Sequence, residues 1–404
     1  MGNARAITTA AIVALAVMLS GCGLIDRVNG VDREAVSIDG VGTLPTPASA
    51  WPSAQYDARH SSGTTAIGPQ TDRVKWVRHL DGNLTPGPVI GVDGSILAAT
   101  NSGILHALDP ATGDDRWTFD GDSVYGSDLS TSPSVLGDGT VLWPGPAGTL
   151  FALDRDGQLL WTEQFSGQVL SPAIGGLNRV YVADLNGQVD AFEIANGIHR
   201  RLWSIQTGGI NYASPSIGPD GTIYAAAGND LVAIADLGDT AVVRWRFGTS
   251  QLVEVSNGVS ESGVVVLGTN DDHQFGVDSH GSKVWELKID AYAYSSSAVR
   301  PDGLAYFADN RGVVRTVDSA TGDVLRTVAP AAPGREHVWT SVVADADGNT
   351  YWASLKGNIY GYNAEGAQLF RLQVDQRIDG YPALDADGTL YVGTTEGVLY
   401  AIGK

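Results

Sequence analysis

Cysteine is almost absent from this chain of 404 residues, because Cys22 is the only one. A single thiol cannot form an internal disulfide, so the fold does not depend on a disulfide framework. A spare exposed thiol is also a liability outside the cytosol, which makes the position of Cys22 informative.

Basic residues are scarce, since 25 lysines and arginines stand against 45 aspartates and glutamates and give a formal net charge of −20. Residues 1–21 hold one charged side chain, Arg5, so the rest of the chain carries −20 − 1 = −21. An acidic body of this kind is unsuited to nucleic acid or to an anionic lipid surface. We therefore expect no nucleic-acid partner.

Long helical patterns and apolar runs able to span a membrane are missing beyond the N-terminus. Hydrophobic residues make up 43% and charged residues 17% of the chain, as in an ordered globular protein. Glycine is abundant, with 51 residues, which favours many short strands joined by tight turns.

The N-terminus has the pattern of an export signal. Arg5 precedes an apolar run from Ala6 to Leu19, which is short for a membrane span and ends in Leu19-Ser20-Gly21-Cys22. This tetrapeptide resembles the bacterial lipobox, in which the cysteine is lipidated and becomes the new N-terminus. An ordinary secretory signal with a chance cysteine is the alternative. We expect a signal peptide at 1–21, a lipid-anchored flexible tether at 22–50 and a folded body at 51–404.

Tryptophan recurs with a period of about 42 residues. Successive spacings are 41, 44, 42, 42 and 40 residues across Trp76, Trp117, Trp161, Trp203, Trp245 and Trp285. Between them, four short apolar runs are separated by Gly and Asp turns, which is typical of one four-stranded antiparallel sheet. A repeat of this length indicates a propeller blade.

Eight such units can be counted from the small residue or proline that opens each first strand. These positions are Pro88, Pro133, Pro172, Pro215, Gly258, Ala298, Val342 and Ala383. The last unit has only three strands, and Trp76 has no strands before it. The sequence therefore predicts an all-β, eight-bladed propeller closed by an N-terminal strand that completes the last blade.

The motif Ala107-Leu108-Asp109-Pro110-Ala111-Thr112-Gly113, followed by Trp117, resembles the quinoprotein-type (PQQ-like) repeat propellers. Trp51-Pro52 and Asp57 to His60 fit the same resemblance, which covers residue 51 to the end. It implies that the six tryptophans dock neighbouring blades. Size, lipobox, acidity and blade number are similar to the non-enzymatic branch that contains the outer-membrane assembly lipoprotein BamB.

Catalytic and metal-binding motifs are not found in the sequence. The dehydrogenase branch of the resembled family carries a vicinal disulfide, which a chain with one cysteine cannot form. His273 and His280 are seven residues apart on one strand, roughly 23 Å, and cannot share an ion. Asp385 to Glu396 echoes a calcium loop but has Leu390 where that loop needs glycine. We predict no catalytic residue, no metal and no cofactor.

Aromatic and charged residues gather in the loops that lead into each first strand and in the turns between second and third strands. Turns do not require tyrosine or tryptophan, so these loops are the candidate binding face. The candidates are Tyr125, Tyr212, Tyr292, Tyr294, Arg311, His337, Trp339, Lys356, Arg377 and Tyr381.

The functional expectation is a non-catalytic cell-envelope lipoprotein, held to a membrane through Cys22, whose propeller is a scaffold for another envelope protein. An accessory subunit of an envelope assembly or secretion machine fits this description, either on the outer membrane facing the periplasm or on the outer face of the cytoplasmic membrane. The alternative is an enzyme, or a small-ligand or glycan receptor, that uses the propeller funnel.

Overall fold

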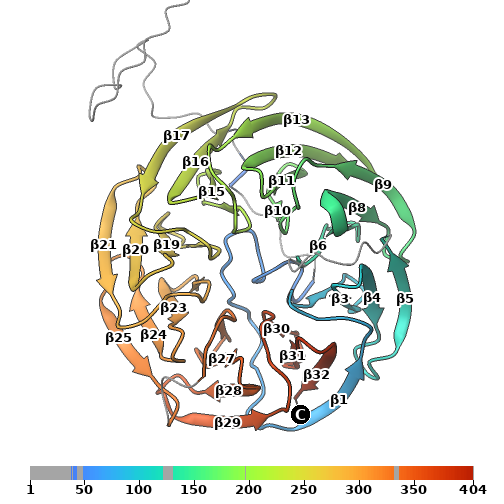
Figure 1. Ribbon diagram of the computed structural model, residues 1–404, viewed down its shortest axis with the longest axis vertical. Coiled ribbons are helices and arrows are strands. Elements are labelled where there is room, and N and C mark those ends of the chain that lie inside the picture. The colour runs from blue at the N-terminus through green and yellow to red at the C-terminus, as the bar shows by residue number, and fades with distance from the viewer. Residues whose placement is uncertain are drawn as a thin grey trace, which may run out of the picture. The chain divides into compact units, whose positions relative to one another are not determined.

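A computed structural model describes residues 38, 40–42, 49–121, 131–195, 197–331 and 336–403. Within these residues, 32 strands form eight sheets of four antiparallel strands each. The sheets are arranged radially about a central axis, with the first strand of each innermost and the last on the perimeter (Figure 1). The prediction of an eight-bladed propeller is confirmed.

The first four blades contain sixteen strands and one short 3-10 helix, η1 Pro146–Gly148. Their bounds are β2 Val89–Ile90, β3 Ile96–Ala99, β4 Ile104–Leu108 and β5 Asp115–Asp120 in blade 1; β6 Ser134–Val135, β7 Val141–Pro144, β8 Thr149–Leu153 and β9 Leu159–Gln164 in blade 2; β10 Ala173–Ile174, β11 Arg179–Ala183, β12 Gln188–Ala195 and β13 Ile198–Gln206 in blade 3; and β14 Ser216–Ile217, β15 Ile223–Ala227, β16 Asp230–Asp236 and β17 Ala241–Gly248 in blade 4.

The other four blades follow the same order. Their bounds are β18 Gly258–Val259, β19 Val265–Gly268, β20 His273–Val277 and β21 Lys283–Lys288 in blade 5; β22 Ala298–Val299, β23 Leu304–Ala308, β24 Val314–Asp318 and β25 Val324–Val328 in blade 6; β26 Val343–Ala344, β27 Thr350–Ala353, β28 Asn358–Tyr362 and β29 Gln368–Gln373 in blade 7; and β30 Ala383–Leu384, β31 Leu390–Gly393, β32 Val398–Ile402 and β1 Val74–His79 in blade 8.

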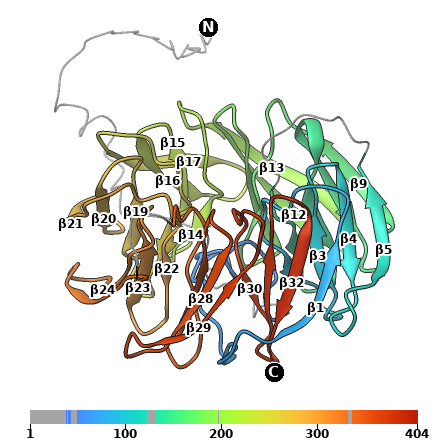
Figure 2. The ribbon, with the colours of Figure 1, turned by 60° about the horizontal axis from the view of Figure 1, so that its bottom comes forward.

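Blade 8 joins the two ends of the propeller, as the sequence predicts. Strand β1 pairs antiparallel with β32, with Val77 opposite Tyr400, so the order across the sheet is β1-β32-β31-β30. Figure 2 shows the two strands side by side. This pairing gives β32 a neighbour on its outer side and leaves the ring without a gap at the chain ends.

The same irregularity occurs in all eight blades. Between the third and fourth strands the register shifts by one residue just before the tryptophan position; in blade 1, Ala107 faces Trp117 and Leu108 faces Asp115, so Arg116 is the extra residue. The shift recurs in the other blades. A bulge of this kind bends the strand and redirects the following side chain.

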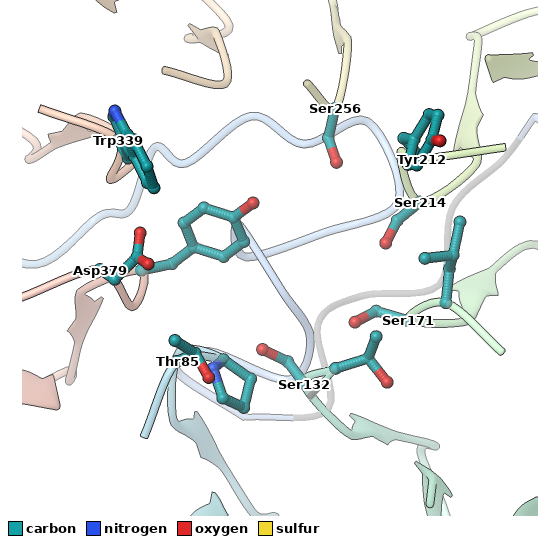
Figure 3. Close-up of a pocket in the computed structure, with 12 residues that line it drawn as sticks. Thr85, Ser132, Ser171, Tyr212, Ser214, Ser256, Trp339 and Asp379 are labelled. Carbon is teal, nitrogen blue, oxygen red and sulfur yellow. The ribbon is translucent and has the colours of Figure 1, made fainter. Parts of the chain in front are cut away.

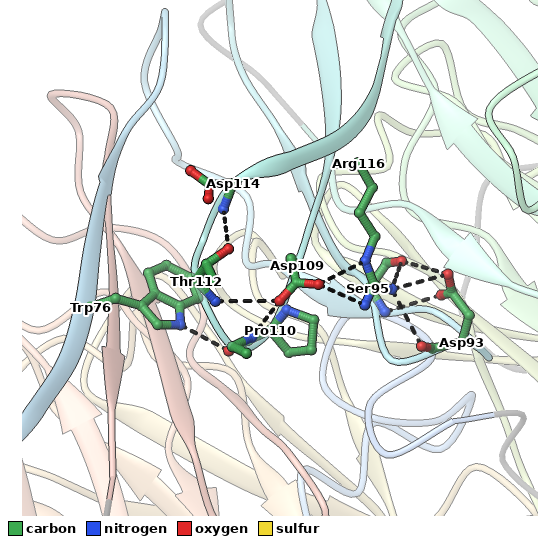
Figure 4. Close-up of polar contacts among 9 residues, drawn as sticks. Trp76, Asp93, Ser95, Asp109, Pro110, Thr112, Asp114 and Arg116 are labelled. Carbon is green, nitrogen blue, oxygen red and sulfur yellow. Dashed lines mark hydrogen bonds and ion pairs between the residues drawn. The ribbon is translucent and has the colours of Figure 1, made fainter.

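The redirected tryptophan reaches the neighbouring blade. Trp76 of blade 8 donates a hydrogen bond from Nε1 to the Pro110 carbonyl of blade 1 over 2.8 Å (Figure 4). Asp109 supports this turn by accepting hydrogen bonds from the N–H groups of Ala111 and Thr112. Gly113 lies in the left-handed region, and a Cβ there would be 2.8 Å from the Trp76 ring. The Asp-Pro-Ala-Thr-Gly motif is therefore a receptor for a tryptophan.

Four of the other five tryptophans also donate to the next blade. Their acceptors are the carbonyls of Arg155 for Trp117, Ser279 for Trp245 and Ser319 for Trp285, and the carboxylate of Asp236 for Trp203. Trp161 differs, because its Nε1 has no partner and its ring stacks on His199 with centroids 3.9 Å apart.

The core lies between successive sheets. One apolar cluster joins Val89, Leu97 and Leu105 of blade 1 to Val141 and Trp143 of blade 2. Second and third strands are buried on both faces, which explains why they appear in the sequence as continuous apolar runs. No helix among the described residues is long and apolar enough to cross a membrane.

Candidate functional site

The two ends of the propeller axis differ. We call one end the loop face, which carries the connections into each innermost strand and the turns between second and third strands. The other end, the turn face, carries the remaining turns. Each innermost strand runs from the loop face to the turn face, so position along that strand measures depth below the loop face.

Residues 49–68, here called the axial segment, run through the centre of the ring (Figure 1). N–H groups of the innermost strands donate to carbonyls of this segment in blade order, over 2.7–3.0 Å. The pairs are Ile90 to Trp51, Val135 to Pro52, Ile217 to Ala58, Val259 to Arg59 and Ala344 to Ser62. The axial segment is therefore bonded to blades 1, 2, 4, 5 and 7 and occupies the channel near the turn face.

Many side chains of the axial segment are buried. Trp51 and Gln55 are each 1% exposed, and the Nδ1 atom of His60 is 3.1 Å from the Asn257 carbonyl. Burial lowers the pKa of His60 to about 4. Gln55, Tyr56, His60 and Ser62 have positive φ angles, a conformation that non-glycine residues rarely adopt. Such strain persists only where surrounding contacts fix the backbone.

Several buried polar atoms around the axial segment have no hydrogen-bond partner in the part of the chain that the structure describes. They are both side-chain polar atoms of Gln55 and of Asn257, and the hydroxyls of Ser216, Ser297 and Ser341. An unpaired buried polar group costs roughly 1–3 kcal/mol. These atoms therefore favour ordered water or a polar ligand along the axis.

Above the axial segment lies a cavity of about 210 Å³, here called the axial pocket. Seven of the eight blades contribute to its wall: Thr85, Pro86, Thr131, Ser132, Leu170, Ser171, Tyr212, Ser214, Ser256, Trp339, Asp379 and Tyr381. Side chains from these loops converge on one space, with Trp339 and Tyr212 on opposite sides (Figure 3).

The axial segment is bonded to the innermost strands deeper in the channel than this pocket, on the side of the turn face. Ser132, Ser214 and Ser256 line the pocket. In each case the residue three positions later, Val135, Ile217 or Val259, donates its N–H to the axial segment. Three strand residues span about 10 Å. The hydrogen bonds to the axial segment thus lie about 10 Å from these serines, on the side of the turn face.

The electrostatics of the axial pocket are simple. Among the described residues, Asp379 is the only carboxylate in its wall, and neither lysine nor arginine lines it. Burial raises the pKa of Asp379, which Arg377 partly opposes, and burial also raises the pKa of Tyr381. The pocket therefore presents hydroxyl groups, aromatic rings and one carboxyl group with a raised pKa.

Beside the pocket, three aromatic residues form a contiguous group, here called the aromatic rim. The centroids of Tyr292 and Tyr294 are 5.8 Å apart, as are those of Tyr294 and Trp339. Tyr292 is 51% and Trp339 42% exposed. Three residues predicted from the loops of two blades are thereby brought together at the mouth of the funnel.

The remaining predicted residues have different environments. Tyr212 and Tyr381 line the pocket, whereas Lys356 and Arg377 are exposed. Arg311 is engaged with Asp309 over 3.1 Å, and His337 is exposed with a positive φ of 52°. Tyr125, like Cys22, lies outside the described residues.

One group outside the pocket has the residue types of a metal site. Ligand atoms of Asp271, Asp272 and His273 all lie within 4.8 Å of one another. The Oδ1 atom of Asp271 already accepts hydrogen bonds from Thr269 and from the His273 N–H, and Asp272 faces Lys288 over 3.3 Å. These hydrogen bonds and this ion pair within the protein therefore explain why the three side chains lie together.

Of the residues that line the pocket, the sequence indicates Tyr212, Trp339 and Tyr381 as candidates but not the serines. It also does not indicate the path of the axial segment, in which Trp51-Pro52 and Asp57 to His60 carry only a family resemblance. Prolines such as Pro133 and Pro215 serve to count the blades, and the residues directly before them, Ser132 and Ser214, line the pocket. Ile38 and Val41, within the expected tether, also contact blades 3 and 4, since Ile38 donates to Asp236 and Val41 accepts from Gly176.

Comparison with known proteins gives a family match over most of the chain. The sequence profile described as "Outer membrane protein assembly factor BamB" matches residues 101–240 and 199–402. The protein of that name from Yersinia pestis is 26% identical over 247 residues, covering 58% of this chain and 61% of the Yersinia protein. The Burkholderia pseudomallei protein of that name is 26% identical over 337 residues, covering 77% and 82%.

Among solved structures, quinohemoprotein alcohol dehydrogenase from Comamonas testosteroni superposes with a TM-score of 0.71. The match covers 91% of this chain and 84% of the enzyme at 13% identity. At that identity the likeness shows a shared propeller fold alone.

Proposed function

This chain belongs to the family described as outer membrane protein assembly factor BamB, and from that premise we propose that it is a non-catalytic scaffold of the cell envelope. Its loop face binds another envelope protein. The fold supplies a rigid frame for this role, because the blades hold their loops at fixed positions around one axis.

The aromatic rim is the observation that carries this proposal. Tyr292, Tyr294 and Trp339 pack against one another yet leave large aromatic surface exposed. Tyrosine and tryptophan are enriched at protein interfaces, where they often supply most of the binding energy. Arg377 and Lys356 lie exposed on the same face and provide a polar surround.

The axial pocket supports a non-catalytic role. Among the described residues, its wall has no histidine, lysine or cysteine, so the serine hydroxyls there have no such base beside them, and Asp379 is the one acidic group. His60, the buried histidine of the axial segment, faces a backbone carbonyl.

The quinone of the dehydrogenase branch does not fit this funnel. That cofactor is a tricarboxylate and requires cationic partners, whereas the described part of the pocket wall carries Asp379 and no lysine or arginine. The channel beneath the pocket is filled by the axial segment. We therefore assign no quinone chemistry to this chain.

Membrane attachment is proposed through lipidation of Cys22. The lipobox cysteine precedes Ile38, the first described residue, by sixteen positions. An extended chain of that length reaches roughly 50–60 Å, enough for the propeller to meet a partner above the membrane surface. Either the outer membrane, facing the periplasm, or the outer face of the cytoplasmic membrane fits this arrangement.

Crosslinking in cells tests the proposal. Full-length tagged protein is crosslinked, recovered from membranes and compared with the variant in which Tyr292, Tyr294 and Trp339 are all alanine. We expect the wild type to capture a specific envelope protein and the triple variant to lose it. Cys22→Ala should release the protein from the membrane fraction and reduce capture.

The matched control replaces three apolar residues exposed on the perimeter, Leu159, Ile198 and Leu325, with serine. This variant should capture the partner as the wild type does. Unchanged capture by the triple aromatic variant, or capture lost equally in the control, would contradict the assignment of the loop face.

A further inference from the structure

One position recurs at the same depth in every blade. It is the residue two positions before each innermost strand, and it is serine in six successive blades: Ser132, Ser171, Ser214, Ser256, Ser296 and Ser341. The equivalent residues of blades 8 and 1 are Tyr381 and Gly87. We call these eight positions the hydroxyl ring.

The two exceptions in the hydroxyl ring fit one another. A Cβ on Gly87 would lie 2.4 Å from the Tyr381 carbonyl oxygen and 2.8 Å from the Tyr381 Cβ. The absent side chain in blade 1 thus allows the backbone of blade 8 to approach closely at Tyr381. The Tyr381 hydroxyl in turn interacts with Ser296, so it belongs to the same polar set. Hydroxyl groups from seven of the eight blades therefore surround the axis.

Some hydroxyl groups of the ring already form hydrogen bonds within the protein. Ser132 donates to the Gly87 carbonyl over 2.8 Å, and the Ser296 oxygen accepts from the Ser256 N–H over 3.2 Å. Ser341 is 1% exposed, and its hydroxyl has no hydrogen-bond partner among the described residues. Five members of the ring line the axial pocket: Ser132, Ser171, Ser214, Ser256 and Tyr381. Each hydroxyl can both donate and accept a hydrogen bond, so these five can bind a ligand whose own groups do the same.

Charge restricts the ligand further. The part of the pocket wall that the structure describes has one carboxylic acid, Asp379, and no cation, so a phosphate or carboxylate would be desolvated there without a counter-charge. A neutral ligand meets no such penalty. Trp339 and Tyr212, on opposite sides of the mouth (Figure 3), offer flat apolar faces to the C–H surface of a ring.

The volume of the axial pocket and its direction of access limit the ligand further. The pocket holds about 210 Å³, less than the about 300–1,000 Å³ of drug-sized sites. The axial segment occupies the channel on the side of the turn face, so a ligand enters and leaves by the loop face. We propose that the axial pocket binds a neutral, hydroxyl-rich ring: a monosaccharide, or the terminal sugar of a glycan.

Calorimetry and saturation-transfer NMR on the purified full-length protein test this proposal. The probes are free glucose, galactose, mannose and N-acetylglucosamine, with glucuronate as the anionic comparator and N-acetyl-arginine amide as the cationic one. We expect at least one neutral sugar to bind with a Kd on the order of 1 mM, as suits a ligand of that size. Glucuronate should bind at least about tenfold more weakly.

Two variants localise the binding. Ser214→Leu fills the pocket, and Trp339→Ala removes a face of its mouth; both positions are partly exposed, so the fold should survive. Each should weaken sugar binding at least about tenfold, while Ile198→Ser on the perimeter should not.

Absence of binding by all four sugars about a hundredfold above the expected Kd would overturn the proposal. So would preferential binding of the anionic or cationic probe, or sugar binding that neither pocket variant changes. The proposal does not rest on a protein partner. Ser214→Leu should weaken sugar binding at least about tenfold while leaving crosslinked capture intact, so failure of one proposal is distinguishable from failure of the other.

Discussion

The N–H of Val135, on the innermost strand of blade 2, donates a 2.7 Å hydrogen bond to the carbonyl of Pro52 in the axial segment. The preceding residue of that segment, Trp51, is 1% exposed and packs in the cluster that joins blades 7, 8 and 1. The segment before the first strand is thus part of the core.

Trp51→Ala should therefore destabilise the propeller strongly. Removing a fully buried tryptophan leaves a cavity and costs roughly 3–5 kcal/mol in free energy of unfolding. Urea denaturation followed by circular dichroism measures this cost. Trp339→Ala, at a 42% exposed position, serves as the control and should cost less than about 1 kcal/mol. Equal costs would mean that the axial segment contributes nothing to the stable fold.

The docking tryptophans offer an internal comparison. Trp285 donates to the Ser319 carbonyl over 2.8 Å, whereas the Trp161 Nε1 has no partner. Trp285→Phe removes a hydrogen bond and leaves a buried carbonyl short of one donor, so it should cost about 1–2 kcal/mol more than Trp161→Phe. Thermal unfolding of the two variants checks the difference. A larger loss for Trp161→Phe would show that the hydrogen bond is not what distinguishes these positions.

Asp236 connects two side chains at the junction of blades 3 and 4. Its buried carboxylate accepts from the Tyr181 hydroxyl over 2.7 Å and from Trp203 Nε1 over 2.9 Å. Asp236→Asn replaces one acceptor oxygen with an amino group that faces donors, and we expect a loss of roughly 2–4 kcal/mol. Chemical denaturation measures this loss in free energy of unfolding. The matched control is Asp239→Asn at an exposed position, which we expect to lie within about 0.5 kcal/mol of wild type.

His60 should make stability depend on pH. Burial lowers its pKa from 6.5 to about 4, so the unfolded state takes up the proton first as pH falls. Its contribution is complete above about pH 6.5 and is lost toward pH 4, a change of roughly 3 kcal/mol. Unfolding free energies of wild type and His60→Gln should therefore converge by about that amount between pH 7 and pH 4. Burial raises the pKa of nearby Asp57, an effect of opposite sign that both proteins share. Parallel pH profiles would contradict the assignment.

The blades and their closure could be predicted because each blade has a local signal. Apolar runs, Asp-Gly turns and a tryptophan recur within about 42 residues, and strand partners such as Ala107 and Trp117 are close in the chain. The absence of strands before Trp76 then identified β1 as the missing strand of blade 8.

The axial segment could not be predicted in the same way. Its contacts join residues far apart, such as Pro52 with Val135 and Ser62 with Ala344, and no repeat marks them. The hydroxyl ring escaped prediction for a related reason. Ser132 and Ser214 appear in the sequence as small residues before a strand, and only closure of the ring turns them toward one axis.

The axial segment also constrains the order in which the protein can fold. It is synthesised before any blade, yet the N–H of Ala344, its partner on blade 7, emerges 282 residues after Ser62. In a linear repeat array each unit is stabilised by its neighbours as it forms. Here the first residues of the body must wait for almost the whole chain, so we expect slow maturation and a single cooperative transition in place of stepwise growth from the N-terminus.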